Sequence, residues 1–500
     1  MARLKHIAQQ RLDKLEKFRG LGLNPYPRSY HRSHAIQESL QLFQQSESDP
    51  AQTLPSEFRL AGRVTAIRFI GKVGFFDIRD GSGKIQVFFS RDILGDDNYQ
   101  LLHEIDIGDI IGVAGKVFRT RAGEISIEAK EFNILAKSLQ PLPEKWHGLV
   151  DVEKRYRQRY LDLISNEEIK TLFLIRSRVI SSFRLFLDNR GFIEVETPVL
   201  QPVAGGALAR RFKTHHQALG LDLYLRIALE LYLKRLIIGG LDKVYEIGRV
   251  FRNEGISTRH NPEFTMAEIY EAYADYEDMM AMLEEMVSFI AQKVTGKTSV
   301  KFGEETINLE PPWPRIRLRE AIKERCGIDF EDYPDVDSLR GRMKQLGQDV
   351  DPKKDRGRLI DELISTYVEP HLMQPTFLVD YPLDMSPLAK RKDNSKTIVE
   401  RFETFIGGME IANAFTELND PLEQRERFLK QKHIQSAESV KSKASDEGEV
   451  DIIDEDFLLA MEYGMPPTGG LGVGIDRLAM LFTGKQSIRE VILFPQLKTK

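Results

Sequence analysis

The sequence contains one cysteine, Cys326, among 500 residues. A lone thiol excludes an internal disulfide framework and a cysteine-based zinc site. Long apolar runs are also missing: the most apolar stretch, residues 231–240, carries Lys234 and Arg235, and nothing approaches the about 18 apolar residues that span a membrane. The N-terminus has charges but lacks the apolar core of a signal peptide. We therefore expect a soluble, cytoplasmic protein without a membrane partner.

A large excess of charge of one sign is absent too. The chain has 71 Lys and Arg against 76 Asp and Glu, a net charge of −5, which argues against indiscriminate binding to nucleic acid but leaves room for a local basic patch. Hydrophobic residues make up 41% and charged residues 29%, so a disordered, collagen-like or mainly coiled-coil chain is excluded. The length predicts roughly two to four domains, and no internal repeat is evident.

Residues 1–57 are predicted to form a basic helix and a linker. Apolar residues recur at helical spacing in residues 1–32, beside eight Lys and Arg and two acids. This amphipathic pattern indicates either a packed helix with a solvated charged face or a helix that contacts RNA phosphates. Residues 40–57 are polar and include two prolines, which is typical of a linker.

Residues 58–143 show a different pattern, with five short strand-like segments separated by glycine-containing turns. Asp80-Gly81 and Ala122-Gly123 are the plausible hairpin turns among them. Five such strands in so little sequence predict a small closed barrel of the OB type. The candidate nucleic-acid contacts interleave aromatic and polar side chains: Arg63, Phe75, Phe76, Gln86 and Phe88.

Those residues suit single-stranded nucleic acid, because aromatic rings stack on unpaired bases and polar side chains bind base edges. The alternative is that the phenylalanines fill the barrel. The sequence does not distinguish Phe75 from Phe76 in this respect.

Residues 144–500 are predicted to form a third region, of mixed helices and strands. A helix is expected from about 167 to 189, followed by a strand at 191–200 that Pro198 closes. Residues 330–375 are typical of helices, and a charged, serine-rich loop is expected at about 434–450.

Two predicted strands, 243–255 and 261–276, are dense in charge. Side chains alternate along a strand, so even-numbered residues share a face; these are Glu246, Arg252 and Glu254 on the first strand and Phe264, Met266, Glu268 and Tyr270 on the second. Burying such groups is costly unless they pair with one another or bind a charged ligand. The alternatives are a structural ion-pair network and a pocket in which Arg grips a phosphate or carboxylate and Phe holds a purine.

A third predicted hairpin lies at 399–420, where Gly407-Gly408 is the turn. A two-residue turn places Phe405 opposite Glu410, with Glu403 diagonal on the same side. Two carboxylates on one face suit Mg²⁺, which binds one or two carboxylates together with substrate phosphates. Strict alternation puts Asn413, Phe415 and Glu417 on the opposite face, so a single site needs a bulge whose position the sequence does not give.

The glycine-rich segment 466–482 predicts a strand that leads into a helix, with Arg477 in the first helical turn. It is not a Walker A loop, since GxxxxGK[ST] is absent, and the βαβ unit of a dinucleotide fold does not follow. What remains is an arginine at a helix N-terminus beside backbone that a ligand can approach.

Several of these segments together resemble class II aminoacyl-tRNA synthetases. FRNEG (251–255) with RHNPEF (259–264) resembles motif 2, GLGVGIDR (470–477) motif 3, and GFIEVETPVL (191–200) motif 1. The barrel followed by RYRQRYLDL (155–163) is similar to subclass IIb. The bacterial lysine-specific branch is indicated by four further segments: 205–216, 224–240, 381–391 and 410–420. The resemblance covers the whole chain.

The resemblance implies an α+β fold, with an N-terminal OB barrel that binds the anticodon and a catalytic domain built on an antiparallel sheet flanked by helices. It implies a homodimer through motif 1. It also implies two reactions: lysine and ATP, with Mg²⁺, give lysyl-adenylate and pyrophosphate, and lysine then passes to the 3′ end of tRNA(Lys). Positioning and charge neutralisation dominate such chemistry, which agrees with the lack of an evident nucleophile–base pair.

The resemblance also implies roles for individual residues. Arg252 and Arg477 are the implied catalytic residues. The implied ATP contacts are Arg252, Glu254, His260, Asn261, Phe264, Glu403 and Arg477, and the implied Mg²⁺ ligands are Glu403 and Glu410. The implied lysine contacts are Gly206, Glu230, Arg252, Glu268, Tyr270, Asn413, Phe415 and Glu417. The implied anticodon contacts are Arg63, Phe75 or Phe76, and Gln86.

Three other classes of protein fit the sequence less well than a lysine–tRNA ligase. An aspartyl or asparaginyl relative would need a cation where Glu417 stands. A relative that lysylates a protein or a lipid would lack the barrel or carry membrane spans. A non-catalytic RNA-binding protein on the same fold would not need Arg252, Glu403, Glu410 and Arg477 together.

Overall fold

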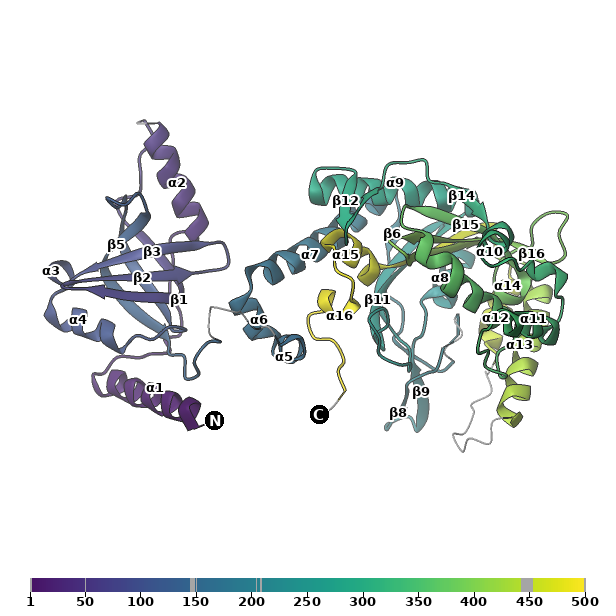
Figure 1. Cartoon of the computed structure of the whole chain (residues 1–500), viewed down its shortest axis with the longest axis horizontal. Coiled ribbons are helices and arrows are strands. Elements are labelled where there is room, and N and C mark those ends of the chain that lie inside the picture. Colours follow the sequence, from purple (N-terminus) through teal and green to yellow (C-terminus); the bar gives the residue numbers. More distant parts are fainter. Residues whose placement is uncertain are drawn as a thin grey trace. The chain divides into compact units, whose positions relative to one another are not determined.

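The computed structural model describes residues 2–49, 51–143, 149, 151–203, 205–206, 209–441 and 453–498. The chain forms two compact units, Met1–Val150 and Asp151–Lys500, each with its own helices and sheet (Figure 1). Within the described ranges, no helix is both long enough and apolar enough to cross a membrane.

The first unit is built around a closed five-stranded barrel with the order β1-β2-β3-β5-β4. Its strands are β1 Phe58–Ile70, β2 Val73–Arg79, β3 Lys84–Ser90, β4 Ile110–Arg119 and β5 Ile125–Ala136. Alternate residues of each strand point inward; in β2 every second residue is buried. The predicted OB-type barrel is therefore confirmed, with turns at the two predicted glycine positions.

Two longer helices precede the barrel, α1 Ala2–Gly20 and α2 Ile36–Ser48. In α1, Phe18 is buried, Arg11 donates to the carbonyl oxygens of Ser138 and Gln140, and Lys14 pairs with Asp106 at 2.8 Å. These two basic side chains thus bind residues of their own unit, as the packed-helix interpretation expects.

Helix α2 corrects the prediction of a linker at residues 40–57. Its sequence is polar, but Ile36, Leu40 and Phe43 recur at helical spacing and join the barrel core. Burial of that narrow apolar stripe stabilises the helix. The Gln- and Ser-rich composition alone does not predict it. The remaining helices of the unit are α3 Arg91–Leu94, α4 Asp96–Leu101 and the 3₁₀ turn η1 Leu102–Glu104.

The second unit contains an eight-stranded sheet with the order β14-β15-β16-β17-β18-β11-β10-β6. The strands are β6 Ile193–Glu194, β10 Lys243–Phe251, β11 Glu263–Ala272, β14 Arg315–Arg317, β15 Thr376–Pro382, β16 Ile398–Ile406, β17 Met409–Thr416 and β18 Thr468–Gly474. The six central strands pair antiparallel, and β14 and β6 pair parallel at the two edges. Smaller sheets pair β12 Ser299–Phe302 with β13 Glu305–Asn308, and β7 Leu200–Gln201 and β8 Lys213–His216 with β9 Leu221–Leu225.

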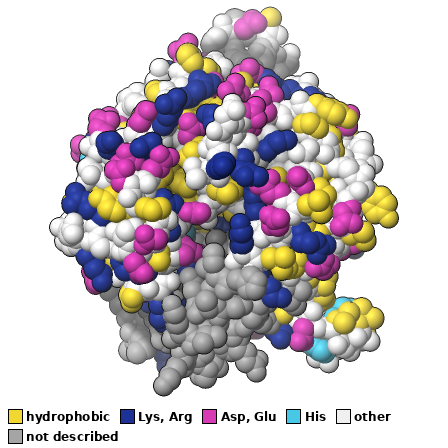
Figure 2. All heavy atoms as spheres, turned by 90° about the vertical axis from the view of Figure 1, so that its right-hand side faces the viewer, with side chains coloured by type: hydrophobic (Ala, Val, Ile, Leu, Met, Phe, Trp, Pro, Cys, Tyr) yellow, Lys and Arg dark blue, Asp and Glu magenta, His cyan; other side chains and the backbone are white. Residues whose placement is uncertain are grey.

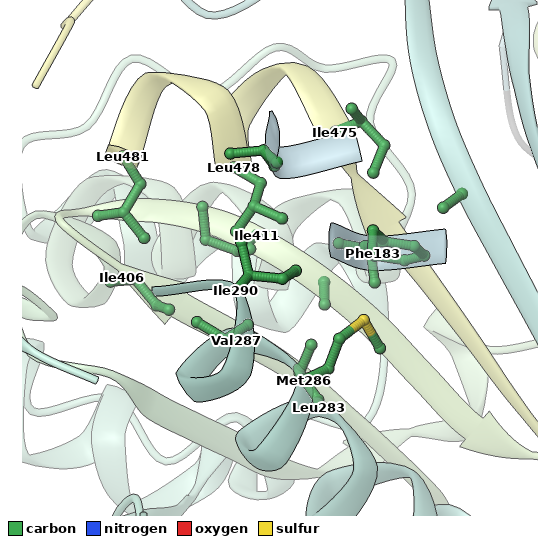
Figure 3. Packing of buried hydrophobic residues seen from close by; sticks show 14 of the residues in the cluster. Phe183, Leu283, Met286, Val287, Ile290, Ile406, Ile411, Ile475, Leu478 and Leu481 are labelled. Carbon is green, nitrogen blue, oxygen red and sulfur yellow. The ribbon is translucent and has the colours of Figure 1, made fainter. Parts of the chain in front are cut away.

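Three helices share the main apolar core with one face of this sheet: α7 Glu167–Asp188, α9 Tyr276–Thr295 and α15 Ile475–Thr483. Figure 3 shows Phe183 of α7, Val287 and Ile290 of α9, and Leu478 of α15 pointing toward one another over the sheet. Helix α9 begins at Asp275, whose carboxylate accepts from two backbone N–H groups of the first turn, a stabilising N-cap.

The opposite face of the sheet carries α8 Glu230–Ile238 on β10 and β11. Odd-numbered Ala267 and Ile269 of β11 lie in the core with α7 and α9. Even-numbered Tyr270 and Ala272 pack instead with Leu233 of α8. The strand alternation thus separates a core face from a second face, where Glu268 and Tyr270 of β11 lie. The other helices are α5 Val152–Arg157, α6 Arg159–Ser165, α10 Leu318–Cys326, α11 Val336–Gln345, α12 Arg356–Leu363, α13 Pro421–Lys441, α14 Glu455–Glu462 and α16 Ile488–Val491.

Several expected elements take a modified form. The helix expected at 167–189 is α7, and residues 330–375 are largely helical. The strand expected at 191–200 is replaced by β6 and β7, two residues each, which pair in different sheets. Pro198, in the segment between them, has no N–H to donate to a ladder. Of the loop expected at 434–450, residues up to Lys441 belong to α13, and residues 442–450 lie outside the described residues.

Positive and negative side chains are interspersed on the face of the molecule in Figure 2. No broad area of one charge covers the described part of that face. This mixture matches the small net charge of the sequence.

Candidate active site

A cavity of about 550 Å³ opens on the second face of the large sheet. Every site residue that the resemblance implies for the catalytic domain lines it. They are Gly206, Glu230, Arg252, Glu254, His260, Asn261, Phe264, Glu268, Tyr270, Glu403, Glu410, Asn413, Phe415, Glu417 and Arg477. Glu246 does not, because it is buried in an ion pair with Arg226 at 2.5 Å, which is a structural role.

The floor of the cavity is the glycine-rich strand β18, between β11 and β17. Gly470 lies across from Tyr270 on one side and Phe415 on the other, and Gly472 lies across from Glu268 and Asn413. The glycines leave open the space between these two rows of side chains. A side-chain carbon added to Gly470 would lie only 1.9 Å from Oε1 of Glu417, so this position excludes any larger residue.

A bulge in β17 brings both halves of that strand to the cavity. Phe405 pairs with Glu410, as the two-residue turn predicts, but Thr404 pairs with Ala412, which leaves Ile411 without a partner on β16. Ile411 and Ala412 are buried in succession. The extra residue reverses the alternation, so that Glu410 before it and Asn413, Phe415 and Glu417 after it all line one cavity.

One end of the cavity is acidic. Glu230, Glu268 and Glu417 are all buried there. Glu268 accepts from the backbone N–H of Leu229 at 3.0 Å and from the Tyr270 hydroxyl at 3.1 Å. Burial, followed by the charge of Glu230, raises the pKa of Glu268 to about 7. Burial likewise raises the pKa of Glu417 well above its ordinary value. These carboxylates therefore favour a ligand that brings positive charge.

Lys234 is a residue of this end that sequence reasoning missed. The side chain is fully buried on α8 and forms ion pairs with Glu230 and Glu417. In the sequence analysis Lys234 is a charge within an apolar run and part of a segment that resembles the lysine-specific branch, without a role of its own. Its position four residues after Glu230 was the available signal, since residues at this spacing are neighbours on one face of a helix.

The other end of the cavity combines arginines with two further carboxylates. Arg477 donates to Oε2 of Glu410 at 2.9 Å. Glu403 accepts from Arg401 at 2.6 Å and from the Tyr381 hydroxyl at 2.8 Å. Burial is the main cause that raises the pKa of Glu403 to about 7, and the neighbouring charge of Glu410 adds to it. Two carboxylates that crowd each other in this way are suited to share a cation.

Arg401 and Tyr381 are also functional candidates that the sequence did not reveal. Arg401 donates both to Glu403 and, at 3.0 Å, to Oδ1 of Asn413. It therefore links the two ends of the cavity. The segment 381–391 resembles the lysine-specific branch, but the resemblance implies no role for Tyr381.

The connection between β10 and β11 supplies the remaining wall. The Arg252 guanidinium lies 5.2 Å from the centre of the Phe264 ring. Partial burial is the main cause that lowers the pKa of His260, and the charge of Arg477 is the second. This imidazole is therefore neutral near pH 7. Asn261 is buried, and its Oδ1 has no hydrogen-bond partner among the described residues. A buried acceptor of this kind is available to a ligand.

The barrel candidates belong to the first unit. Phe76 is fully buried in the barrel core and contacts Phe89 edge-on, so it cannot stack on a base. Phe75 is half-buried on the outer face of β2, beside Phe88 of β3 with ring centres 5.4 Å apart. Arg63 and Gln86 also alternate outward on neighbouring strands.

Both units match known families. The family of class II tRNA synthetases (D, K and N) matches residues 151–498, and the OB-fold nucleic acid binding domain of the anticodon type matches residues 58–135.

Relatives that match almost the whole chain carry one name. The chain is 56% identical to a lysine–tRNA ligase of Dehalococcoides mccartyi over 99% of its length and 98% of the relative's. The corresponding enzymes of Moorella thermoacetica and Bacillus subtilis are 53% and 49% identical, each over 98% of this chain and 97% of the relative. With the expected residues gathered in one cavity and matches of this extent, the chain belongs to the class II aminoacyl-tRNA synthetases, among the ATP-dependent lysine–tRNA ligases.

Proposed function

We propose that the cavity activates L-lysine with ATP and that the outer face of the barrel binds the anticodon of tRNA(Lys). The observation that carries this proposal is the division of the cavity, with buried carboxylates at one end and arginines at the other. A lysine carboxylate oxygen attacks the α-phosphorus, the bond to the bridging oxygen breaks, and pyrophosphate leaves. The 3′-terminal ribose hydroxyl of the tRNA then attacks the adenylate carbonyl and AMP leaves.

The acidic end is the proposed amino-acid site. Glu230, beside Gly206, binds the α-ammonium group, and Glu417 with Tyr270 binds the ε-ammonium group. Glu268, Asn413 and Phe415 complete the walls, and Phe415 packs along the four-carbon stem. A carboxylate that hydrogen-bonds a charged group contributes about 1.5–3 kcal/mol, so two such contacts select a ligand with two ammonium groups.

The opposite end is the proposed nucleotide site. Arg252 bridges the lysine carboxylate and the α-phosphate, where charge develops as the new bond forms. The Phe264 ring stacks on adenine, and Arg477 holds the γ-phosphate. Neutral His260, Glu254 and the unpartnered Oδ1 of Asn261 provide polar contacts to the nucleotide.

Glu403 and Glu410 are the proposed ligands of Mg²⁺. The donor set fits this ion, because the two carboxylates face one cavity and Glu403 has a raised pKa that a cation would relieve. No group of three metal-ligating side chains occurs among the described residues, which suits an ion that takes its remaining ligands from phosphates and water. Bound there, Mg²⁺ would neutralise phosphate charge.

The proposed homodimer forms through the motif 1 region. Five large apolar side chains are exposed there on α7 and around β6 and β7: Leu174, Leu185, Ile193, Val199 and Leu200. A surface this apolar is typical of a protein–protein interface. Because tRNA charging serves protein synthesis, we further place the enzyme in the cytoplasm.

The proposal is tested by ATP–pyrophosphate exchange with each of the twenty amino acids and no tRNA. We expect exchange with lysine alone, and only with Mg²⁺ present. Exchange with aspartate or asparagine would overturn the assignment of the acidic end. Absence of exchange with every amino acid would favour a non-catalytic RNA-binding protein, for which direct tRNA binding is the next measurement.

A further inference from the structure

Lys234 joins two of the three carboxylates of the acidic end. Its side chain has 0% exposure, and Nζ lies 2.5 Å from Oε1 of Glu230 and pairs also with Oε2 of Glu417. The Phe415 ring centre is 5.5 Å from the same nitrogen. Burial alone would lower the pKa of Lys234, but the charges of Glu230 and Glu417 outweigh it and the pKa is raised. The ammonium group therefore stays charged although water does not reach it.

Lys234 pairs with one oxygen of each of the two carboxylates. The second oxygen of Glu230, Oε2, lies 3.5 Å from the position of a side-chain carbon on Gly206. The second oxygen of Glu417, Oε1, faces Gly470 and makes no hydrogen bond to any residue in the described ranges. Both glycines line the cavity. One buried lysine thus binds one oxygen of each carboxylate, and the second oxygen of each lies beside a glycine that lines the cavity.

Lys234 also changes the charge of this end. Glu230, Glu268 and Glu417 carry a formal charge of −3 when ionised, and Lys234 reduces it to −2. Lysine brings two ammonium groups, a charge of +2. Without Lys234, one buried carboxylate would stay uncompensated in the complex, which costs several kcal/mol in protein interiors or forces the carboxylate to bind a proton.

We propose that Lys234 is a positioning residue for amino-acid selection, which holds Glu230 and Glu417 at a fixed spacing and matches the pocket charge to a ligand with two ammonium groups. The inference rests on the proposed roles of Glu230 and Glu417 in binding lysine. A fixed spacing between two anchoring oxygens selects the length of the ligand's stem. Lys234 therefore favours lysine over ornithine, which is one methylene shorter.

The test is the variant Lys234→Met of the full chain, in which an unbranched side chain of similar length replaces the ammonium group. ATP–pyrophosphate exchange gives kcat and KM for lysine, ornithine and ATP. We expect the KM for lysine to rise roughly 10-fold or more, the preference for lysine over ornithine to fall, and kcat and the KM for ATP to stay within roughly 2-fold.

The matched control is Lys137→Met in the first unit. Lys137 is also fully buried and pairs with two carboxylates, Asp106 at 2.5 Å and Asp109 at 2.8 Å, but it lies in the barrel unit. Its loss should leave the KM for lysine and the lysine-to-ornithine preference unchanged.

An unchanged KM and an unchanged lysine-to-ornithine preference in Lys234→Met would overturn the inference. Equal losses for lysine and ATP would also overturn it, because they indicate a general structural role. If Lys234→Met does not fold, Lys234→Gln retains one donor group, and the same two outcomes decide. Glu230→Gln and Glu417→Gln distinguish failure of the proposed lysine pocket from failure of the inference about Lys234. Normal KM values for lysine in both variants would refute the proposed pocket. Raised KM values in these variants, beside a normal KM in the Lys234 variant, would refute only the inference.

Discussion

Arg477 donates from Nη1 to Oε2 of Glu410 at 2.9 Å and to the backbone carbonyl of the same residue at 2.7 Å. The arginine proposed for the γ-phosphate is thus held by a carboxylate proposed for Mg²⁺. Each charge compensates the other in the structure. Under the proposed roles both groups gain new partners when a nucleotide and its cation bind, so the pair preorganises this end of the cavity at little cost.

Replacing this arginine should impair adenylate formation. For Arg477→Ala we expect pyrophosphate exchange to fall by about 10²–10³-fold in kcat, because a donor for developing phosphate charge is lost. The control is Arg425→Ala, which removes an exposed arginine paired with Glu455 at 2.8 Å and should be silent. Exchange within a factor of two of the unchanged enzyme would remove Arg477 from its assigned role.

The ε-ammonium assignment is tested by Glu417→Gln. The amide keeps the shape and loses the charge, so lysine binding should weaken by about 1.5–3 kcal/mol, measured as a higher KM for lysine with an unchanged KM for ATP. Glu271→Gln is the comparison, because Glu271 lies on β11 and pairs with Lys243 at 2.7 Å outside the cavity. Similar lysine KM values in the two variants would contradict the assignment.

The two glycines of the cavity floor should respond differently to alanine. In Gly470→Ala the new carbon would lie 1.9 Å from Oε1 of Glu417 and 2.7 Å from Cε1 of Tyr270, so both side chains must move and the KM for lysine should rise at least tenfold, roughly the effect of one lost charged hydrogen bond. In Gly472→Ala the nearest atoms are 3.6 and 3.9 Å away, which is ordinary contact. Equal effects of the two variants on lysine KM would disprove the crowding argument.

Lysine binding should depend on pH through Glu268. Its pKa is about 7 in the empty enzyme, and the ionised form attracts the ammonium groups of the ligand. The KM for lysine should therefore fall as pH rises from 6 to 8 and level off above the pKa. Glu417 acts in the same direction, because burial raises its pKa as well, whereas the Tyr270 hydroxyl stays protonated, since its pKa is raised well above 10. Glu268→Gln should make the profile shallower; an equally steep profile in that variant would assign the dependence elsewhere.

Alanine variants of the two adjacent phenylalanines of the barrel should have different effects, one on tRNA charging and the other on stability. Phe75→Ala should slow tRNA charging and spare pyrophosphate exchange, because it removes a surface ring that contributes about 1–3 kcal/mol when a base stacks on it. Phe76→Ala should lower the unfolding free energy of the first unit by about 3–5 kcal/mol through a core cavity. Measurements of charging, exchange and thermal unfolding on both variants decide; a stable Phe76→Ala protein with impaired charging would reverse the assignment.

Most residues that line the cavity could be predicted from the sequence, because they lie in short motifs whose strand alternation is regular. Glu268 and Tyr270 share a face for this reason. The burial of Lys234 could not be predicted, because nothing in the local sequence distinguishes a buried lysine from a solvated one. Its partner Glu417 is also far away in the sequence. Helix α2 was not predicted, because its polar average composition indicates a linker. Three apolar residues suffice to anchor it on the barrel core.

The unpaired residue Ile411 has a consequence for how the enzyme can vary. Before Ile411 the even-numbered Glu410 lines the cavity, and after it the odd-numbered Asn413 and Phe415 do. The proposed phosphate end therefore depends on the first part of β17 and the proposed amino-acid end on the second. Deleting a single residue at this point would retain Glu410, Asn413 and Phe415 and still turn the proposed amino-acid half toward the helical core. At this position the number of residues matters more than their identity, so substitutions are tolerable where a change of length is not.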